Sequence, residues 1–172
     1  AYDGWSEALG DVTPLTLGSW LGGDRDGHPG VGADTLDFAF ASQAALLLDH
    51  YDRELKVLWS DLAISSDYIV VSEAVTALAE EGGKADPSVH RRDEPYRLAI
   101  EAIHVRLRHT RARLTGEAGQ GGYDGPAAFT ADLNALIASL QAHGGGRRGP
   151  RAGKGLEQVR LAVAKADRKS TR

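Results

Sequence analysis

The stretch EPYRLAIEAIHVRLRHTRARL, residues 94–114, is the strongest indication of the fold class because it has the clearest helical pattern in the chain. Proline at the first position of a helix loses no hydrogen bond, so Glu94-Pro95 marks a helix start. Residues of one face then recur at alternating steps of four and three, as in an amphipathic helix. That face comprises Tyr96, Ile100, Ile103, Leu107, Thr110 and Leu114. The stretch therefore predicts a helix with one buried face.

The other faces of this helix carry charged residues. They include Arg106, Arg108, Arg111 and Arg113. We expect a solvated surface on which these arginines form ion pairs with Glu94 or Glu101. His104 and His109 are interpreted as surface residues rather than metal ligands, because no histidine pair in the chain has the spacing of a zinc site.

Two helices are predicted before this stretch. The first runs from Asp34 to about Trp59, where apolar residues again recur at steps of three and four and Asp34 can serve as the N-cap. The second runs roughly from Asp67 to Glu81. We expect Gly82-Gly83 to close it, because glycine readily adopts the left-handed conformation of a helix end. The polar segment 84–92 is interpreted as a loop.

The sequence after residue 114 predicts two more helices between glycine-rich loops. The segment 116–126 is interpreted as a flexible connection, and a basic glycine loop follows at 144–155. Helices are predicted from about Ala127 to His143 and over 156–166. The inward face of the longer one comprises Phe129, Leu133, Leu136, Ile137 and Leu140. The predicted fold class is mainly α, with one short strand or loop around residues 15–20.

The composition is that of a globular protein, with 42% hydrophobic and 26% charged residues. A formal net charge of -4 gives no general attraction to nucleic acid or to acidic membranes, and we expect neither as a partner. The lack of cysteine excludes disulfides and thiolate chemistry.

With no long apolar run and no secretory signal, a cytoplasmic location is expected. Because the chain starts at Ala1 and contains no methionine, we expect a processed protein or an internal segment.

The stretch GSWLGGDRDGHPGV, residues 18–31, suits neither helix nor strand but offers binding chemistry. Its glycines allow a close approach of the backbone and conformations that other residues resist. Asp24 and Asp26 flank Arg25 and can fix its guanidinium through charge-assisted hydrogen bonds, which would make it a receptor for phosphate or carboxylate. A tight structural turn, with the aspartates capping neighbouring amides, accounts for the same residues equally well. The supporting glycines are Gly22, Gly23 and Gly27.

Two other interpretations of charged, glycine-rich stretches fail on spacing. A calcium loop would need an oxygen ligand and a glycine at the places of His28 and Pro29. In RRGPRAGKG, residues 147–155, a phosphate-binding loop would need glycine in place of Arg148 and serine or threonine in place of Gly155. The same basic loop has little aromatic support for binding nucleic acid.

Residues 18–29 resemble a motif of the phosphoenolpyruvate carboxylase family, Gly-Ser-Trp-Met-Gly-Gly-Asp-Arg-Asp-Gly-Asn-Pro. Ten of the twelve positions match, and Leu21 and His28 take the places of methionine and asparagine. The stretch at 94–114 resembles the family's Glu-Pro-Tyr-Arg helix, and LNALIASLQAHGGG resembles the helix and turn before its next barrel strand. The resemblance runs from about residue 15 to residue 164, as expected for an internal segment of the enzyme.

The resemblance implies an α-rich fold around an eight-stranded barrel, a homotetramer, and carboxylation of phosphoenolpyruvate by bicarbonate to oxaloacetate and phosphate. This lyase reaction belongs to anaplerotic carbon dioxide fixation, which supplies the tricarboxylic acid cycle. The resemblance also implies a need for Mg²⁺ or Mn²⁺, with the metal ligands and the catalytic histidine and lysine outside this segment. Within the segment it implies that Arg25 contacts the substrate phosphate, and the segment alone is expected to be inactive.

The expected layout is an active-site strand or loop at 15–31, helices over 34–166, and a tail at 167–172. This tail departs from the strand that the family would continue into, so we interpret it as non-native sequence. His28 places a titratable ring where the family has an amide, which would make substrate binding depend on pH if the ring lies near the phosphate. The alternative function is a non-catalytic helical module that binds a partner through its apolar faces.

Overall fold

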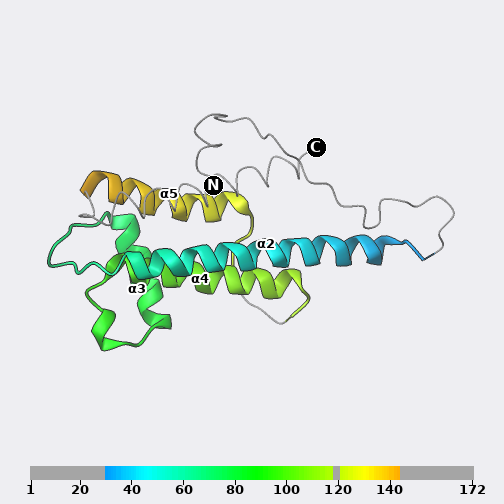
Figure 1. Ribbon diagram of the computed structural model, residues 1–172, viewed down its shortest axis with the longest axis horizontal. Coiled ribbons are helices and arrows are strands. Elements are labelled where there is room, and N and C mark those ends of the chain that lie inside the picture. The colour runs from blue at the N-terminus through cyan, green and yellow to red at the C-terminus, as the bar shows by residue number, and fades with distance from the viewer. Residues whose placement is uncertain (1–29, 118–120, 144–172) are drawn as a thin grey trace. The chain divides into compact units, whose positions relative to one another are not determined.

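The computed structural model describes residues 30–117 and 121–143, and these residues form helices (Figure 1). Four are α-helices, a short 3-10 helix precedes the third of them, and the described ranges contain no strand. The elements are α2 (Ala33–Asp61), α3 (Glu73–Ala85), η1 (Val89–Arg91), α4 (Pro95–Leu114) and α5 (Pro126–His143). The mainly α fold class is confirmed for these residues. The strand predicted around 15–20, the helix at 156–166 and the tail lie outside them.

The chain divides into two compact units, residues 1–40 and 41–172. In the first unit, the described residues 30–40 contain the start of α2. This helix begins one residue earlier than predicted, so Asp34 lies in its first turn instead of at the N-cap. A carboxylate in that position still interacts favourably with the positive end of the helix dipole.

The core of the second unit forms where the apolar faces of the helices meet. In α2 the buried face contains Tyr51, Leu55 and Leu58, and in α4 it contains the residues that periodicity predicts, except Leu114, which is 43% exposed. The largest fully buried side chains are Tyr96, Leu55, Leu62, Ile100, Ile103, Leu107, Leu133 and Leu136. No described helix has the combination of length and apolar character that a membrane crossing requires.

Polar contacts show that α2 and α4 lie side by side and run antiparallel (Figure 1). Near the end of α2, the Trp59 carbonyl accepts a hydrogen bond of 3.0 Å from Arg97 Nε, close to the start of α4. Further back along α2, Asp49 pairs at 2.9 Å with Arg111, close to the end of α4. The later contact in α2 involves a residue early in α4, and the earlier contact in α2 involves a residue late in α4. The two helices therefore run in opposite directions.

Helix α3 packs closely against α4 because of a glycine in its interior. A Cβ atom at Gly82 would lie 1.8 Å from the carbonyl oxygen of Leu98, so only glycine permits this approach. The prediction that Gly82-Gly83 closes the helix is therefore wrong: α3 continues to Ala85, and neither glycine has a positive φ. The start is also later than predicted, at Ser72, whose Oγ accepts a hydrogen bond of 3.4 Å from the amide of Val75.

Helix α5 agrees with its prediction, and its five predicted inward residues are buried. Ser139, 1% exposed, joins three elements because its hydroxyl lies 2.8 Å from the Tyr96 hydroxyl and accepts a hydrogen bond of 3.1 Å from the Ser72 amide. Contacts of this kind fix α5 against the starts of α3 and α4.

The described part of the connection between α4 and α5 is anchored to the core, which corrects its interpretation as a flexible link. Tyr123 is buried, and its ring centroid lies 5.3 Å from that of Phe129. Its amide donates a hydrogen bond of 2.7 Å to Thr110 Oγ1, and its hydroxyl donates one of 2.7 Å to Asp132. The segment is rich in glycine and has little apolar content on average. A single aromatic residue, Tyr123, nevertheless packs its ring into the core and anchors the segment there.

Candidate functional site

The residues predicted to bind substrate lie outside the described ranges. They are Arg25 and its supporting residues Gly22, Gly23, Asp24, Asp26 and Gly27, together with His28. Their proposed roles stay predictions that follow from the sequence motif. The described residues contain a different feature with binding geometry, a cavity between α2 and α4.

The arginines of α4 do more than the predicted surface pairing. Arg108 pairs with Glu101 at 3.6 Å, as expected. Arg106 instead joins three helices: its Nε donates a hydrogen bond of 2.9 Å to Glu81 of α3, and its Nη1 donates one of 2.5 Å to Asp132 of α5. Hydrogen bonding to Glu81 and the negative charges of Asp132 and Glu81 outweigh the effect of burial and raise the pKa of the Arg106 guanidinium above its ordinary value. Arg106 therefore links α3, α4 and α5, and its guanidinium is not free to bind a ligand.

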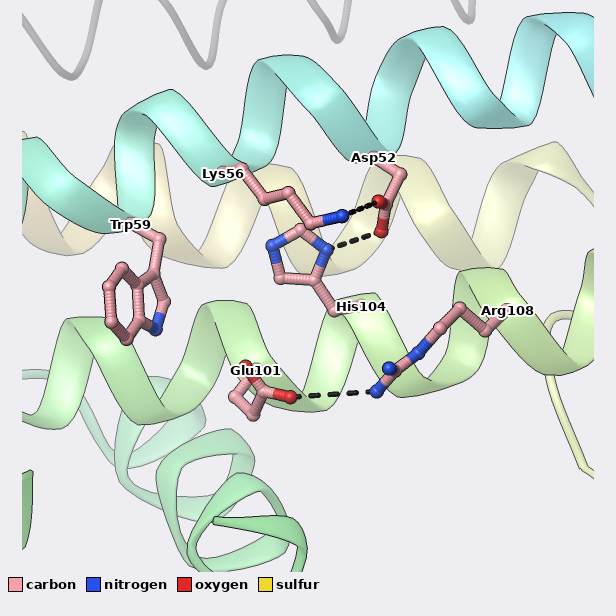
Figure 2. A pocket seen from close by; sticks show the side chains of 6 residues that line it. All are labelled: Asp52, Lys56, Trp59, Glu101, His104 and Arg108. Carbon is pink, nitrogen blue, oxygen red and sulfur yellow. Dashed lines mark hydrogen bonds and ion pairs between the residues drawn. The ribbon is translucent and has the colours of Figure 1, made fainter. Parts of the chain in front are cut away.

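The α2–α4 cavity has a volume of about 240 Å³, and six side chains line it (Figure 2). Helix α2 contributes Asp52, Lys56 and Trp59, and α4 contributes Glu101, His104 and Arg108. Five of the six carry titratable or charged groups, and the sixth is a large aromatic ring. The cavity therefore combines an apolar wall with several hydrogen-bonding groups, as small-molecule sites do.

His104 forms the inner part of this cavity, and its interpretation as a surface residue is wrong. The residue is 5% exposed, and its Nδ1 lies 2.6 Å from Asp52 Oδ1. Because an ionised carboxylate can only accept hydrogen bonds, Nδ1 carries a proton and donates a hydrogen bond to Asp52. The other ring nitrogen, Nε2, is buried and has no hydrogen-bond partner among the described residues.

Asp52 is kept ionised by its neighbours. Its burial raises the pKa of the carboxyl group, but the hydrogen bonds from Lys56 and His104 outweigh this effect and lower the pKa below its ordinary value. The Lys56 ammonium lies 2.6 Å from Asp52 Oδ2. Both carboxylate oxygens are therefore occupied, one by each neighbour.

The described residues do not form a metal site. No group of three or more His, Asp or Glu side chains in residues 30–117 and 121–143 has the geometry to hold a metal ion. The Mg²⁺ or Mn²⁺ that the family resemblance implies therefore finds no fitting ligand set in the described part of the chain, and we assign no reaction step to a metal there.

The α2–α4 cavity is not apparent from the sequence, because its residues come from two helices that are far apart in the chain. One signal was present: His104 directly follows Ile103 and is one helical turn from Ile100, at the margin of the buried face. A polar residue at such a margin is buried or exposed according to the neighbouring helix, which periodicity alone does not identify.

Comparisons with known proteins agree with the sequence motif. A family model described as phosphoenolpyruvate carboxylase matches residues 4–161. A curated phosphoenolpyruvate carboxylase of Caulobacter vibrioides is 48% identical over 158 residues, which cover 85% of this chain and 17% of that protein. The corresponding proteins of Burkholderia vietnamiensis and Azoarcus sp. are 42% and 44% identical, over 75% and 76% of this chain and 14% and 15% of their own lengths. No solved structure matches the chain.

The chain thus spans between 14% and 17% of the length of these three curated relatives. The match nevertheless begins before the glycine-rich motif and extends beyond α5, so it includes every described helix. Because the family model covers most of its residues, the chain belongs to the phosphoenolpyruvate carboxylase family.

Proposed function

We propose that this chain is an internal part of a phosphoenolpyruvate carboxylase, a lyase that carboxylates phosphoenolpyruvate with bicarbonate to oxaloacetate and phosphate. The observation that carries the proposal is the match over residues 4–161 to a family whose curated members are several times longer. On this proposal the enzyme is a cytoplasmic homotetramer that uses Mg²⁺ or Mn²⁺ held by residues outside the segment.

The proposed layout has an active-site strand or loop at 15–31, helices over 34–166, and a non-native tail at 167–172. The helices of the second unit supply a packed scaffold, and the loop supplies a substrate-binding group. This arrangement is supported by the position of the GGDRDG motif before α2 in the sequence.

The proposed role of Arg25 is to bind the phosphate of phosphoenolpyruvate. A guanidinium presents several N–H donors in one plane, which suits a phosphate better than a lysine does. Attack of bicarbonate on the phosphate transfers a phosphoryl group and leaves an enolate, so negative charge persists through the reaction. A cation held in place by Asp24 and Asp26 stabilises that charge without first having to reorganise.

The test is an Arg25→Gln variant of the full-length enzyme that contains this segment. We expect kcat/KM for phosphoenolpyruvate to fall about 10²-fold to 10³-fold, because a charged donor to the reacting group is lost. Arg92→Gln is the matched control, since Arg92 is exposed and lies in the loop before α4. An Arg25→Gln enzyme with unchanged kcat/KM would refute the role of Arg25.

A non-catalytic helical module is the second candidate, and exposed apolar side chains favour it. In the second unit, Leu46 and Val57 of α2 are 69% and 59% exposed, and Val70 in the following connection is 70% exposed. Amide spectra of the labelled chain with added phosphoenolpyruvate separate the two candidates. Shifts centred on residues 22–27 support substrate binding, whereas their absence at millimolar ligand supports the module.

A further inference from the structure

We propose that the connection between α2 and α3 receives an extended segment of the parent enzyme, which pairs with residues 69–71 as an added strand (Figure 1). The parent enzyme is the longer carboxylase of which this chain is proposed to be an internal part, so the inference rests on the proposed function. All the residues of the connection belong to the second unit.

The connection is anchored to the core through alternate side chains. Ile69 and Val71 are partly buried and pack against the core, whereas Tyr68 and Val70 are 86% and 70% exposed. Alternation with a period of two is the pattern of an extended chain that lies with one face on a core. The residue that follows, Ser72, also has extended backbone, with φ −70° and ψ 157°. The segment therefore presents a fixed, strand-like surface.

The backbone of this segment has hydrogen-bonding groups without partners. Within the part of the chain that the structure describes, the N–H and C=O groups of Ile69, Val70 and Val71 make no hydrogen bond. An exposed row of such groups on an extended chain is a template for pairing with another strand. In strand addition of this kind, backbone hydrogen bonds supply the attraction, and alternate side chains supply the specificity.

The open edge of the segment is the one formed by Ile69 and Val71. In an extended chain, the N–H groups of residues two apart point to the same edge. The Ser72 amide donates a hydrogen bond of 3.1 Å to Ser139 Oγ of α5, so the Val70 amide faces the side on which α5 lies. The N–H and C=O groups of Ile69 and Val71 then point to the opposite edge, where we place the added strand.

The exposed side chains set the chemistry of the occupant. Side chains on the same face of neighbouring strands lie about 5 Å apart and interact. Tyr68 is aromatic and Val70 is β-branched, and residues of these kinds favour one another across a strand pair. The paired positions of the occupant must also carry N–H groups, which proline lacks. The occupant is therefore an extended apolar segment without proline at its paired positions.

The small size of the site favours a segment of the same polypeptide. A stable contact between separate proteins needs about 20–30 residues on each side, far more than residues 68–71 offer. A segment of the same polypeptide is held nearby at a high effective concentration, so a smaller contact suffices. The parent enzyme has ample chain for this purpose, because this chain spans between 14% and 17% of the length of its three curated relatives.

Hydrogen exchange, compared between the isolated chain and the full-length enzyme, tests the proposal. In the isolated chain, the amides of residues 69–71 should exchange rapidly. In the full-length enzyme, we expect exchange at Ile69 and Val71 to slow about tenfold or more, and exchange at Val70 to change less. Unchanged exchange at Ile69 and Val71 would overturn the proposal, and equal slowing at all three amides would overturn strand pairing. Slowing that disappears when the enzyme is diluted to separate subunits would overturn it in favour of a second copy.

A pair of matched variants separates the docking from the folding of the chain. Val70→Asp in the full-length enzyme should restore rapid exchange at Ile69 and Val71, because aspartate disfavours strands and its charge would lose water beside an apolar partner. Val89→Asp is the control, since Val89 is 65% exposed and lies in η1, outside the connection. Neither substitution should change the urea midpoint of the isolated chain, because both side chains are exposed. Equal exchange in the two variants would contradict the proposed site.

Carboxylase activity of the same full-length preparation separates this inference from the proposed function. An active enzyme in which Ile69 and Val71 exchange as rapidly as in the isolated chain would refute the docking and leave the function intact. Slow exchange at these residues in a full-length protein without carboxylase activity would support the docking and refute the function.

Discussion

Asp52 has a pKa below its ordinary value because two neighbours outweigh the effect of its burial. The depressed pKa is linked to stability, since the folded state then favours the ionised form more than the unfolded state does. The stabilisation is fully present above the ordinary aspartate value of about 3.9. It is lost as the pH falls below that value and through the lower pKa of the folded state. Asp52 and His104 therefore form a contact between α2 and α4 that acid breaks.

An Asp52→Asn variant tests this contact. We expect a lower free energy of unfolding at neutral pH, because the amide replaces the charged partner of His104 and Lys56. The stability difference from the parent should shrink as the pH falls below about 4. Urea titrations across this range measure the effect, with Asp67→Asn as the control at an exposed aspartate. A difference that stays constant with pH would contradict the linkage.

At the scale of elements, the packing of α3 on α4 depends on one glycine of a pair. Gly82 faces α4, whereas a Cβ atom at Gly83 would meet nothing within 4 Å. Both residues lie inside the helix with ordinary helical backbone, so their different surroundings alone set their roles. Gly82 permits the close packing of α3 on α4. Gly83 makes no such contact, so its only effect is to add flexibility to the unfolded chain.

Alanine substitutions at these neighbouring glycines should have opposite effects. Gly82→Ala should lower the free energy of unfolding by about 1–3 kcal/mol or more, because the new methyl group would overlap the backbone of Leu98. Gly83→Ala should raise it by about 0.5–1 kcal/mol, because alanine favours the helix. Thermal and urea unfolding measure both changes. Equal effects of the two substitutions would show that α3 does not pack on α4 through Gly82.

At the scale of the whole molecule, the described helices form the core of the second unit, and the proposed substrate-binding loop lies outside the described residues. Interhelical contacts such as those of Arg106 and Ser139 hold this core together. On the proposed function, the core acts as a scaffold, and catalysis needs groups from other parts of a longer enzyme.

The isolated chain is therefore expected to be inactive. Purified chain with phosphoenolpyruvate, bicarbonate and Mg²⁺ should yield no oxaloacetate above the rate without protein, because the implied catalytic and metal-binding groups lie outside it. A coupled assay for oxaloacetate measures this, and full-length enzyme serves as the positive control. Production of oxaloacetate by the chain would contradict the assignment of catalysis to other segments.

The helical class, the start of α4 at Glu94-Pro95, the inward face of α5 and the family motif could all be predicted from the amino-acid sequence. These features are local, because periodicity, a proline at a helix start and a run of matching residues need no knowledge of neighbours. The burial of His104, the role of Gly82 within α3 and the anchoring of Tyr123 became known only from the packing of the helices. Each depends on a segment distant in the chain, and packing against that segment overrides the local preference of the residue.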